Sequence, residues 1–283
     1  MSIFSDVLLT VDFDRTLTAP DSSIPARNLE AIRYFIENGG TFTVNTGRSL
    51  PMSHIYKDIV PVNAPLLVYN GSAWYDTKTD TLCNCALIPL DPVEVIADVQ
   101  DRFPELNVEI QGLEHHYLYQ KNEAWERYCA HNGCPWAYEA ADKTGPFLKF
   151  AVYGKFESAY VGSMFNITPR EAELFEQVMA HIQEHYGDVV DMFRACPRIL
   201  DVHAKGVSKI NSARKLQQEL GKKILVCVGD AENDLNMLYG ADYAFCPGDA
   251  SIASLFPNVC PCGEGAVADV IYEKIPAIVE NRS

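Results

Sequence analysis

The chain has 283 residues, of which 48% are hydrophobic and 22% charged, as in an ordinary globular protein. Its formal net charge of −15 argues against a nucleic-acid partner, because nucleic-acid binding rests mainly on clusters of Lys and Arg. No stretch approaches the roughly 18 consecutive apolar residues of a membrane span, so we also expect no membrane partner.

The N-terminus and the cysteines predict a cytoplasmic protein. "MSIFSDVLLTVDF" has neither a basic n-region nor a small-residue cleavage site, so we expect no signal peptide. The nine cysteines include two C-x-C pairs, at positions 83 and 85 and at 260 and 262. Structural zinc sites usually use the wider spacing C-x2-C to C-x4-C, so we expect buried thiols in a reducing cytoplasm rather than zinc.

The first 70 residues alternate between strand and helix patterns. The predicted elements are a strand at 7–11, a helix opened by Pro25 and closed by Gly39-Gly40, a strand at 41–44, a helix at 50–58 and a third strand at 65–71. Such alternation is typical of βαβ units and predicts a parallel sheet.

The last 85 residues continue the same rhythm. The predicted elements are strand 198–202, helix 207–220, strand 223–230, a helix from about 233 to 240, the short strand "YAFC" and a helix around 265–275. The run "KILVCVGD" is the most continuous apolar stretch, as expected of a central parallel strand that is buried on both faces.

The middle of the chain, residues 84–193, has a different character. It is rich in aromatic residues and His, and 147–154 is a predicted strand. Its clearest element is a helix with Thr168 at the N-cap, Glu171 completing a capping box and Gly187 at the end. This segment can form a small α/β unit of its own.

The predicted fold is therefore α/β, a doubly wound parallel sheet with an inserted domain. Residues 1–83 and 194–283 form the core, and residues 84–193 form an inserted α/β cap domain. The oligomeric state does not follow from the sequence.

Polar side chains gather at the carboxyl ends of the predicted parallel strands, the edge where ligands bind in open α/β sheets. They are Asp12 and Asp14 after "LLTV", Thr46 after "TFTVN", Lys209 at the start of the helix after "RILDV", and Asp230 and Asp234 after "LVCVG". Each has a structural alternative, such as a helix N-cap or a turn, but all of them are predicted to lie at one edge.

The carboxylates of Asp12, Asp14 and Asp230 predict an oxygen-rich site for Mg2+, which takes one or two carboxylates together with substrate phosphate oxygens. Lys209 adds a positive charge for the phosphoryl group, and the Thr46 hydroxyl can donate to its oxygens. Asp12 is then free to attack phosphorus and form an aspartyl-phosphate. Asp14 is placed to protonate the leaving oxygen and later to activate water.

The motifs "DFDRT", "NTGR", "GVSKINSARKL" and "GDAENDLNML" resemble, in order and spacing, the four motifs of the haloacid dehalogenase-like hydrolase superfamily. About 110 residues (84–193) are inserted between the core segments that carry the Thr and Lys motifs, as in its Cof-type phosphatases, which carry a large α/β cap there. The matching segments cover about 5–80 and 195–276. The resemblance implies the Rossmann-like core of that superfamily.

The resemblance also implies roles for individual residues. Asp12 would be the nucleophile and a Mg2+ ligand, Asp14 the general acid/base and a ligand through its backbone carbonyl, and Asp230 the third protein ligand. Candidate phosphate-binding residues are Thr46, Gly47, Arg48, Lys209 and Asn233, and Asn233 also supports the loop together with the candidate supporting residues Thr16 and Asp234.

Two features fall outside the matched pattern. Arg15 stands where the family commonly has glycine, and we expect its side chain to extend into solvent rather than contact substrate. In the inserted segment, four residues are candidates for the substrate pocket, although such residues more often serve packing. They are His115, His116, Trp125 and Lys149.

The predicted function is a Mg2+-dependent phosphatase acting on a small phosphorylated metabolite, for example a sugar phosphate. A phosphomutase of the same superfamily would use the same residues but return the phosphoryl group to the substrate. A phospho-receiver domain shares the acidic pocket, the Thr and the Lys, but a positioned acid/base at Asp14 under a cap favours turnover over a long-lived phosphoaspartate.

Overall fold

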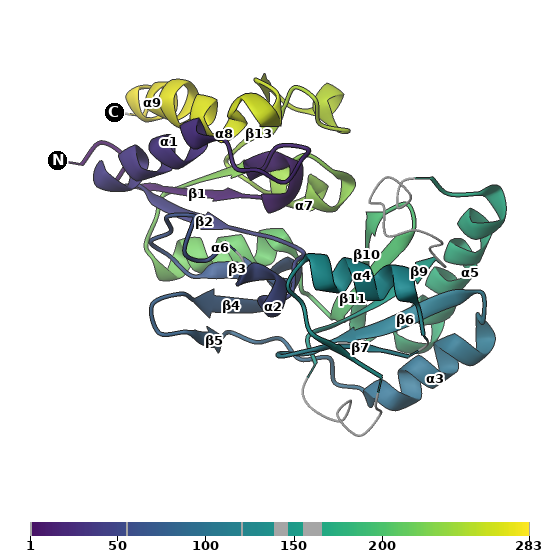
Figure 1. Ribbon diagram of the computed structural model, residues 1–283. Helices are drawn as coiled ribbons and strands as arrows, with labels where there is room; N and C mark the ends of the chain where they lie inside the picture. The colour runs from purple at the N-terminus through teal and green to yellow at the C-terminus, as the bar shows by residue number, and fades with distance from the viewer. Residues whose placement is uncertain (1, 55, 120, 139–146, 155–165, 283) are drawn as a thin grey trace. The chain divides into compact units, whose positions relative to one another are not determined.

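The computed structural model describes residues 2–54, 56–119, 121–138, 147–154 and 166–282, and the chain divides into two compact units. The core unit comprises Met1–Gly47, Tyr56–Cys83 and Ser208–Ser283. The inserted unit comprises Arg48–Ile55 and Asn84–Val207. Figure 1 shows both units, and each is described here by itself.

The core unit is built on a five-stranded, all-parallel sheet with strand order β14-β13-β12-β1-β2. The strands are β1 (Val7–Val11), β2 (Thr41–Val44), β12 (Ile224–Val228), β13 (Tyr243–Pro247) and β14 (Asn258–Val259). Every residue of β1 and β12 is buried, which confirms the prediction of central strands covered on both faces.

Helices cover both faces of this sheet, so the predicted doubly wound α/β core is confirmed (Figure 1). On one face lie α1 (Ala26–Glu37), α8 (Ala266–Asp269) and α9 (Ile275–Glu280); on the other lie α6 (Lys209–Glu219) and α7 (Leu235–Tyr239). Predicted and observed elements agree to within a few residues here because each helix carries one apolar face and each strand an apolar run.

The predicted third strand of the parallel sheet has a different partner. β3 (Leu66–Val68) forms an antiparallel sheet with β4 (Ala73–Asp76), which in turn pairs with β5 (Thr81–Cys83). A single parallel bridge between Asn45 and Leu67 links β3 to the chain that leaves β2. The predicted helix at 50–58 is also shorter, because α2 covers only Leu50–Ser53.

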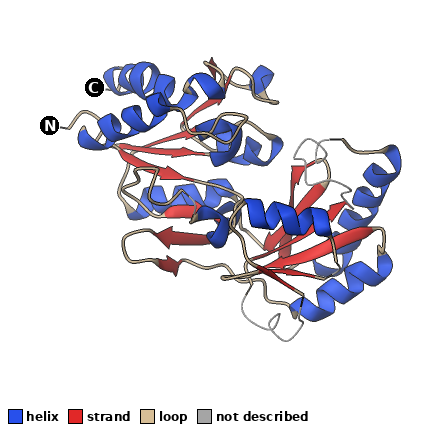
Figure 2. Cartoon of the chain, in the orientation of Figure 1, coloured by secondary structure: helices blue, strands red, loops and turns tan. Residues whose placement is uncertain are grey.

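The inserted unit contains a six-stranded sheet with order β10-β11-β9-β6-β7-β8, antiparallel except for the pair β7-β8. Its strands are β6 (Leu106–Gln111), β7 (His116–Leu118), β8 (Trp136–Ala137), β9 (Lys149–Gly154), β10 (Val190–Cys196) and β11 (Ile199–Ala204). Its longer helices are α3 (Pro92–Arg102), α4 (Glu123–His131) and α5 (Pro169–Tyr186). Figure 2 shows α4 on one side of this sheet and α3 and α5 on the other.

The two faces of the inserted sheet differ in polarity. Phe150 and Val152 of β9 belong to an apolar core that also contains side chains of α3 and α5. Residues on the opposite face alternate with them, and there Lys149 and Asp201 form a buried ion pair of 2.9 Å next to the buried His203. The face that carries α4 is therefore rich in buried polar groups.

The strand predicted at 198–202 exists, but it is not a strand of the core sheet. It is β11, which lies between β10 and β9 in the inserted sheet. The inserted unit consequently ends at Val207 rather than at the predicted boundary after residue 193, and it also takes in residues 48–55. The apolar pattern of this segment correctly predicts a strand, but a local pattern does not specify the pairing partner.

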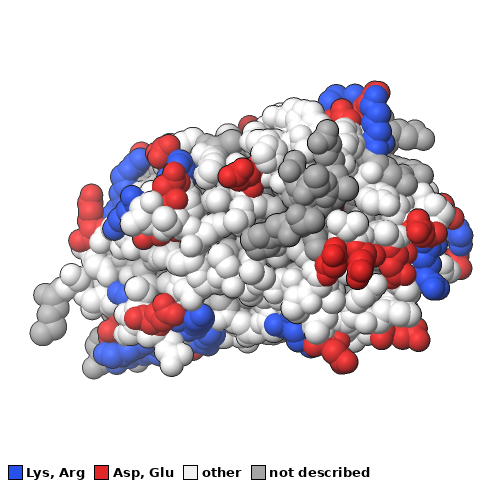
Figure 3. Space-filling view, turned by 90° about the horizontal axis from the view of Figure 1, so that it is seen from below, with Lys and Arg blue, Asp and Glu red and all other residues white. Residues whose placement is uncertain are grey.

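The hydropathy of the helices and the distribution of surface charge bear on possible partners. Among the helices that it describes, none is both long enough and apolar enough to cross a membrane. On the face drawn in Figure 3, Lys and Arg side chains lie in small groups next to Asp and Glu.

The capping box at the start of α5 is confirmed and is open to a stability test. The backbone N–H of Glu171 donates to Thr168 Oγ1 at 3.2 Å, and the backbone N–H of Thr168 donates to Glu171 Oε2 at 3.1 Å. We predict that Thr168→Ala lowers the free energy of unfolding of the inserted unit by about 0.5–2 kcal/mol, because the backbone N–H of Glu171 loses its acceptor, Thr168 Oγ1. Denaturant unfolding and hydrogen exchange across residues 169–186 measure it. Thr168→Ser, which keeps the oxygen, is the control; equal stability of both variants would contradict the prediction.

Candidate active site

The carboxyl ends of β1, β2 and β12 meet at one edge of the core sheet, because the three strands are neighbours and run parallel. The backbone continues this pairing past the strand ends: Asp12 N donates to Val228 O at 2.9 Å, and Asn45 N donates to Val11 O at 2.8 Å. The segments that follow these three strands therefore lie side by side and carry the candidate residues other than Lys209. Lys209 begins α6 and was predicted to follow a strand of the parallel sheet, but the preceding strand, β11, belongs to the inserted sheet.

Lys209 is the centre of the cluster. Its Nζ lies 2.5 Å from Asp12 Oδ1 and 2.7 Å from Asp234 Oδ1, and its side chain is only 1% exposed. Burial alone would lower the pKa of this ammonium group, but the two carboxylates outweigh burial and raise the pKa above its usual value. Lys209 is therefore a fixed positive charge beside the predicted nucleophile.

Asp234 holds the loop after β12 in place. Its Oδ2 accepts hydrogen bonds from the backbone N–H groups of Asp230, at 3.0 Å, and Ala231, at 3.2 Å, while its Oδ1 faces Lys209. A Cβ atom at Gly229 would lie 2.6 Å from Asp234 Cγ, so the close approach of this loop requires glycine. Asp234 therefore connects this loop to Lys209, and its supporting role remains a prediction.

Thr16 supports the other side of the cluster. It is fully buried, and its hydroxyl donates to Asp230 Oδ1 at 3.1 Å. Asp230 follows β12 and Thr16 lies in the turn after β1, so this bond connects the two loops that carry the acidic motifs.

Negative charge exceeds positive charge in this cluster. Oxygen atoms of Asp12, Asp230 and Asp234, all buried, lie within 4.8 Å of one another around the single ammonium group of Lys209. Burial raises the pKa of Asp12 well above its usual value; Lys209 opposes this rise, and the neighbouring carboxylates add to it. Burial and Asp234 raise the pKa of Asp230 to about 7. Such a donor set of hard oxygens fits a divalent cation.

Asp14 and Arg15 lie in the turn that follows β1, and both side chains are exposed. Asp14 is thus not one of the buried acidic groups, which is compatible with a proton-transfer role and with a ligand role for its carbonyl alone. Arg15 has a left-handed backbone (φ 58°), a conformation that favours glycine, and this explains why the family commonly has glycine here. Its exposure agrees with the prediction that it extends into solvent.

The loop after β2 places Thr46 and reveals a residue that the sequence analysis missed. Thr46 is buried; its N–H donates to Leu67 O, and its carbonyl accepts from Asn70 N–H, both at 2.8 Å. Asn45 Nδ2 donates to the backbone oxygen of Lys209 at 2.9 Å and so fixes the start of α6. No sequence signal marks Asn45, because its partner is 164 residues away.

The remaining candidates are placed as follows. Gly47 ends the first segment of the core unit, whereas Arg48 belongs to the inserted unit, where its Nη1 donates to Asn132 Oδ1 at 3.2 Å. Asn233 is half-buried in the short turn Glu232–Asp234, next to the cluster in sequence.

The candidate pocket residues of the inserted unit are mostly internal. His116, Trp125 and Lys149 are less than 5% exposed, and only His115 is partly exposed. For Trp125, whose Nε1 donates to Glu109 Oε2 at 2.5 Å, the packing alternative is the one that the structure favours.

Comparisons with known proteins identify the family of the chain. A family model described as haloacid dehalogenase-like hydrolase matches residues 9–253. The HMP-PP phosphatase of Serratia proteamaculans is 24% identical over 282 residues, 92% of each chain. The 5-amino-6-(5-phospho-D-ribitylamino)uracil phosphatase of Bacillus subtilis is 21% identical over 236 residues, 82% of each chain.

Solved structures show the same fold. A haloacid dehalogenase-like hydrolase from Bacteroides thetaiotaomicron has a TM-score of 0.77 at 19% identity, covering 93% of this chain and 97% of that one. A subclass IIB sugar phosphatase of the same superfamily has a TM-score of 0.74 at 18% identity, covering 95% and 98%. The family model spans most of the sequence, including the loops that follow β1 and β12. The chain therefore belongs to the haloacid dehalogenase-like hydrolases and is an enzyme.

Proposed function

We propose that the protein is a Mg2+-dependent phosphatase that hydrolyses a small phosphorylated metabolite through an aspartyl-phosphate. The observation that carries the proposal is the buried cluster of Asp12, Asp230 and Asp234 around Lys209. Three ionised carboxylates and one ammonium group leave a net charge of −2, which one divalent cation would neutralise. A divalent cation and a phosphate ester together would complete such a site.

The side chains of Asp12 and Asp230 and the backbone carbonyl of Asp14 would hold the metal. When bound, Mg2+ supplies positive charge that neutralises phosphate oxygens and favours phosphoryl transfer. Lys209 binds the phosphoryl group, favours the ionised form of Asp12 and orients it, since its Nζ already contacts that carboxylate at 2.5 Å. Thr46 and Gly47 offer a hydroxyl and a backbone N–H to the phosphoryl oxygens.

The reaction has two steps. An oxygen of Asp12 forms a bond to phosphorus while the bond to the leaving oxygen breaks, and Asp14 gives its proton to that oxygen. Asp14, now ionised, accepts a proton from water, which attacks phosphorus and releases inorganic phosphate and the Asp12 carboxylate. The exposure of Asp14 suits this role, because it must exchange protons with substrate and water.

The substrate class rests on the relatives. Those compared here include phosphatases of a ribityl-uracil phosphate, of HMP-PP and of sugars, all of them small phosphorylated compounds. We propose the same class for this chain, with a sugar phosphate as one member of it. A screen of phosphorylated metabolites tests this directly. Released inorganic phosphate is the readout for a phosphatase, and transfer of phosphate to a second sugar hydroxyl is the readout for a phosphomutase.

We predict that activity requires Mg2+ and disappears in excess EDTA. Asp230→Asn keeps the shape of the side chain but removes a ligand charge, so it should raise the Mg2+ concentration for half-maximal activity by at least about 10–100-fold. Titration of phosphate release against Mg2+ measures the change. Asp101→Asn, an exposed position of α3, is the control and should leave the titration unchanged. Full turnover in EDTA by metal-free protein would refute the metal requirement.

A second prediction separates the two aspartates of "DFDRT". Asp12→Asn should form neither product nor phosphoenzyme. Asp14→Asn should release a burst of p-nitrophenol from p-nitrophenyl phosphate, because this leaving group needs little protonation, and should then stall as a phosphoenzyme with turnover reduced roughly 10²–10⁴-fold. Mass spectrometry of quenched protein would find the added phosphate on the peptide containing Asp12. Retained turnover in Asp12→Asn would exclude covalent catalysis by this residue.

A third prediction concerns pH. The pKa of Asp230 is about 7 in the metal-free fold and about 4 in the unfolded chain, so the folded state binds more protons between these values and its stability falls as pH rises through this window. Mg2+ should therefore raise the melting temperature more at pH 8 than at pH 5. Thermal unfolding with and without Mg2+ measures the difference, and Asp230→Asn should reduce it. A Mg2+ effect independent of pH would contradict the assignment.

A further inference from the structure

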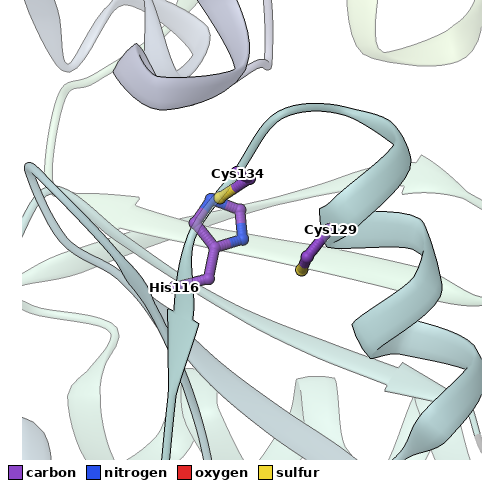
Figure 4. A group of neighbouring side chains, drawn as sticks. All are labelled: His116, Cys129 and Cys134. Atoms are coloured by element: carbon purple, nitrogen blue, oxygen red, sulfur yellow. The ribbon is translucent and has the colours of Figure 1, made fainter.

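A second cluster of metal-ligating side chains lies inside the inserted unit. Ligand atoms of His116, Cys129 and Cys134 are all within 4.8 Å of one another, and each residue is at most 2% exposed. His116 begins β7, Cys129 lies in the last turn of α4, and Cys134 follows that helix. Figure 4 shows the three side chains directed toward one another.

A hydrogen bond between Nε2 and Ser49 orients the imidazole of His116, and Nδ1 is the other ring nitrogen. Its Nε2 lies 2.8 Å from the buried Ser49 Oγ. Its Nδ1 is buried and makes no hydrogen bond within the part of the chain that is described; the carboxylate nearest to it is Glu109, whose Oε2 is 3.5 Å away. Burial alone would lower the pKa of His116, but Glu109 outweighs burial and raises the pKa to about 9. Zinc binding through Nδ1 would therefore displace a proton and leave the other one on Nε2, donated to Ser49.

The turn between the two cysteines brings their sulfur atoms together. "CAHNGC" has the C-x4-C spacing that structural zinc sites use, and the turn is closed by a backbone hydrogen bond of 2.9 Å from Cys134 N–H to Cys129 O. Gly133 has the left-handed φ of 65° that the turn needs. The two C-x-C pairs considered in the sequence analysis lie elsewhere, and two of those four cysteines are exposed.

We propose that His116, Cys129 and Cys134 bind a Zn2+ ion. One imidazole and two thiolates are the soft donor set that selects zinc over Mg2+, in contrast to the oxygen donors of the core unit. Two thiolates neutralise the ion, so the buried site carries little net charge of its own.

The alternative is a purely structural cluster, in which His116 and Glu109 form an ion pair and the thiols serve as small apolar groups. It accounts for the 3.5 Å contact between Nδ1 and the Glu109 carboxylate. The zinc site accounts for the meeting of three ligand atoms within 4.8 Å of one another. The two descriptions differ in whether the protein holds metal, which can be measured.

A zinc ion here would fix the segment that follows Thr46 and Gly47 in the chain. Ser49 contacts the ligand His116, and Arg48 donates to Asn132, which lies in the turn between the ligands Cys129 and Cys134. The ion would thus tie residues 48 and 49 to the inserted unit. It is a structural ion, independent of the proposed phosphatase site.

The test uses the purified protein of 283 residues. It is reconstituted with zinc in the presence of excess Mg2+, so that Mg2+ occupies the carboxylate cluster, and it is then desalted. Elemental analysis should find about one zinc per chain, and Co2+ in place of zinc should give the thiolate-to-metal charge-transfer absorption that an all-oxygen site lacks. Cys129→Ser and Cys134→Ser should lose the absorption and the zinc. Ser49→Ala, which removes only the partner of Nε2, should weaken zinc affinity by roughly 10–100-fold.

Two controls keep the result interpretable. Cys196→Ser, a partly buried cysteine of the same unit outside the cluster, should bind zinc as the wild type does. Asp230→Asn should also retain zinc, because it alters only the core unit. In case the ligand variants unfold, zinc removal from the wild type by a chelator should lower its melting temperature and make Cys129 and Cys134 reactive to a thiol reagent.

The proposal is overturned if the wild type retains no zinc after reconstitution and gives no charge-transfer band with Co2+. It is equally overturned if bound zinc persists in folded Cys129→Ser and Cys134→Ser but disappears in Asp230→Asn, since the metal would then belong to the carboxylate cluster.

Discussion

The core unit depends on one buried cation between two carboxylates. Lys209 Nζ contacts both Asp12 and Asp234, and the three residues come from the end of β1, the start of α6 and the loop after β12. A buried charge without a partner is strongly unfavourable, so losing one member of such a set typically costs about 3–5 kcal/mol. Asn45 adds to this constraint by holding the backbone of Lys209. The same contacts that stabilise the sheet edge also align the proposed nucleophile.

The cluster is stable as a scaffold but electrostatically incomplete. Three buried carboxylates face one ammonium group, and the raised pKa values of Asp12 and Asp230 express that imbalance. A divalent cation bound here, as proposed, would in turn attract a phosphate despite the net charge of −15. An acidic protein could then act on an anionic substrate, because the bound metal ion would supply positive charge at the site.

The two faces of the sheet in the inserted unit bury different kinds of side chain. One face is an ordinary apolar core under α3 and α5, whereas the face that carries α4 buries the ion pair of Lys149 with Asp201 and the cluster around His116. Buried polar groups persist only where partners satisfy them. Of the pocket residues suggested by the sequence, most are internal to this face, so replacing Trp125 would test packing before it tested substrate choice.

The sequence alone determined the features that depend on neighbours along the chain. The apolar runs of β1 and β12, the capping box at Thr168 and the acidic motifs at the strand ends all follow from local pattern, and all were found in place. Only the tertiary structure decided which strands pair. The apolar pattern of β11 is compatible with either sheet. Two contacts join residues that are distant in the chain: the hydrogen bond from Asn45 to Lys209 and the cluster of His116 with two cysteines. Pairing and clustering of this kind are selected by the packing of the whole unit, which local pattern does not encode.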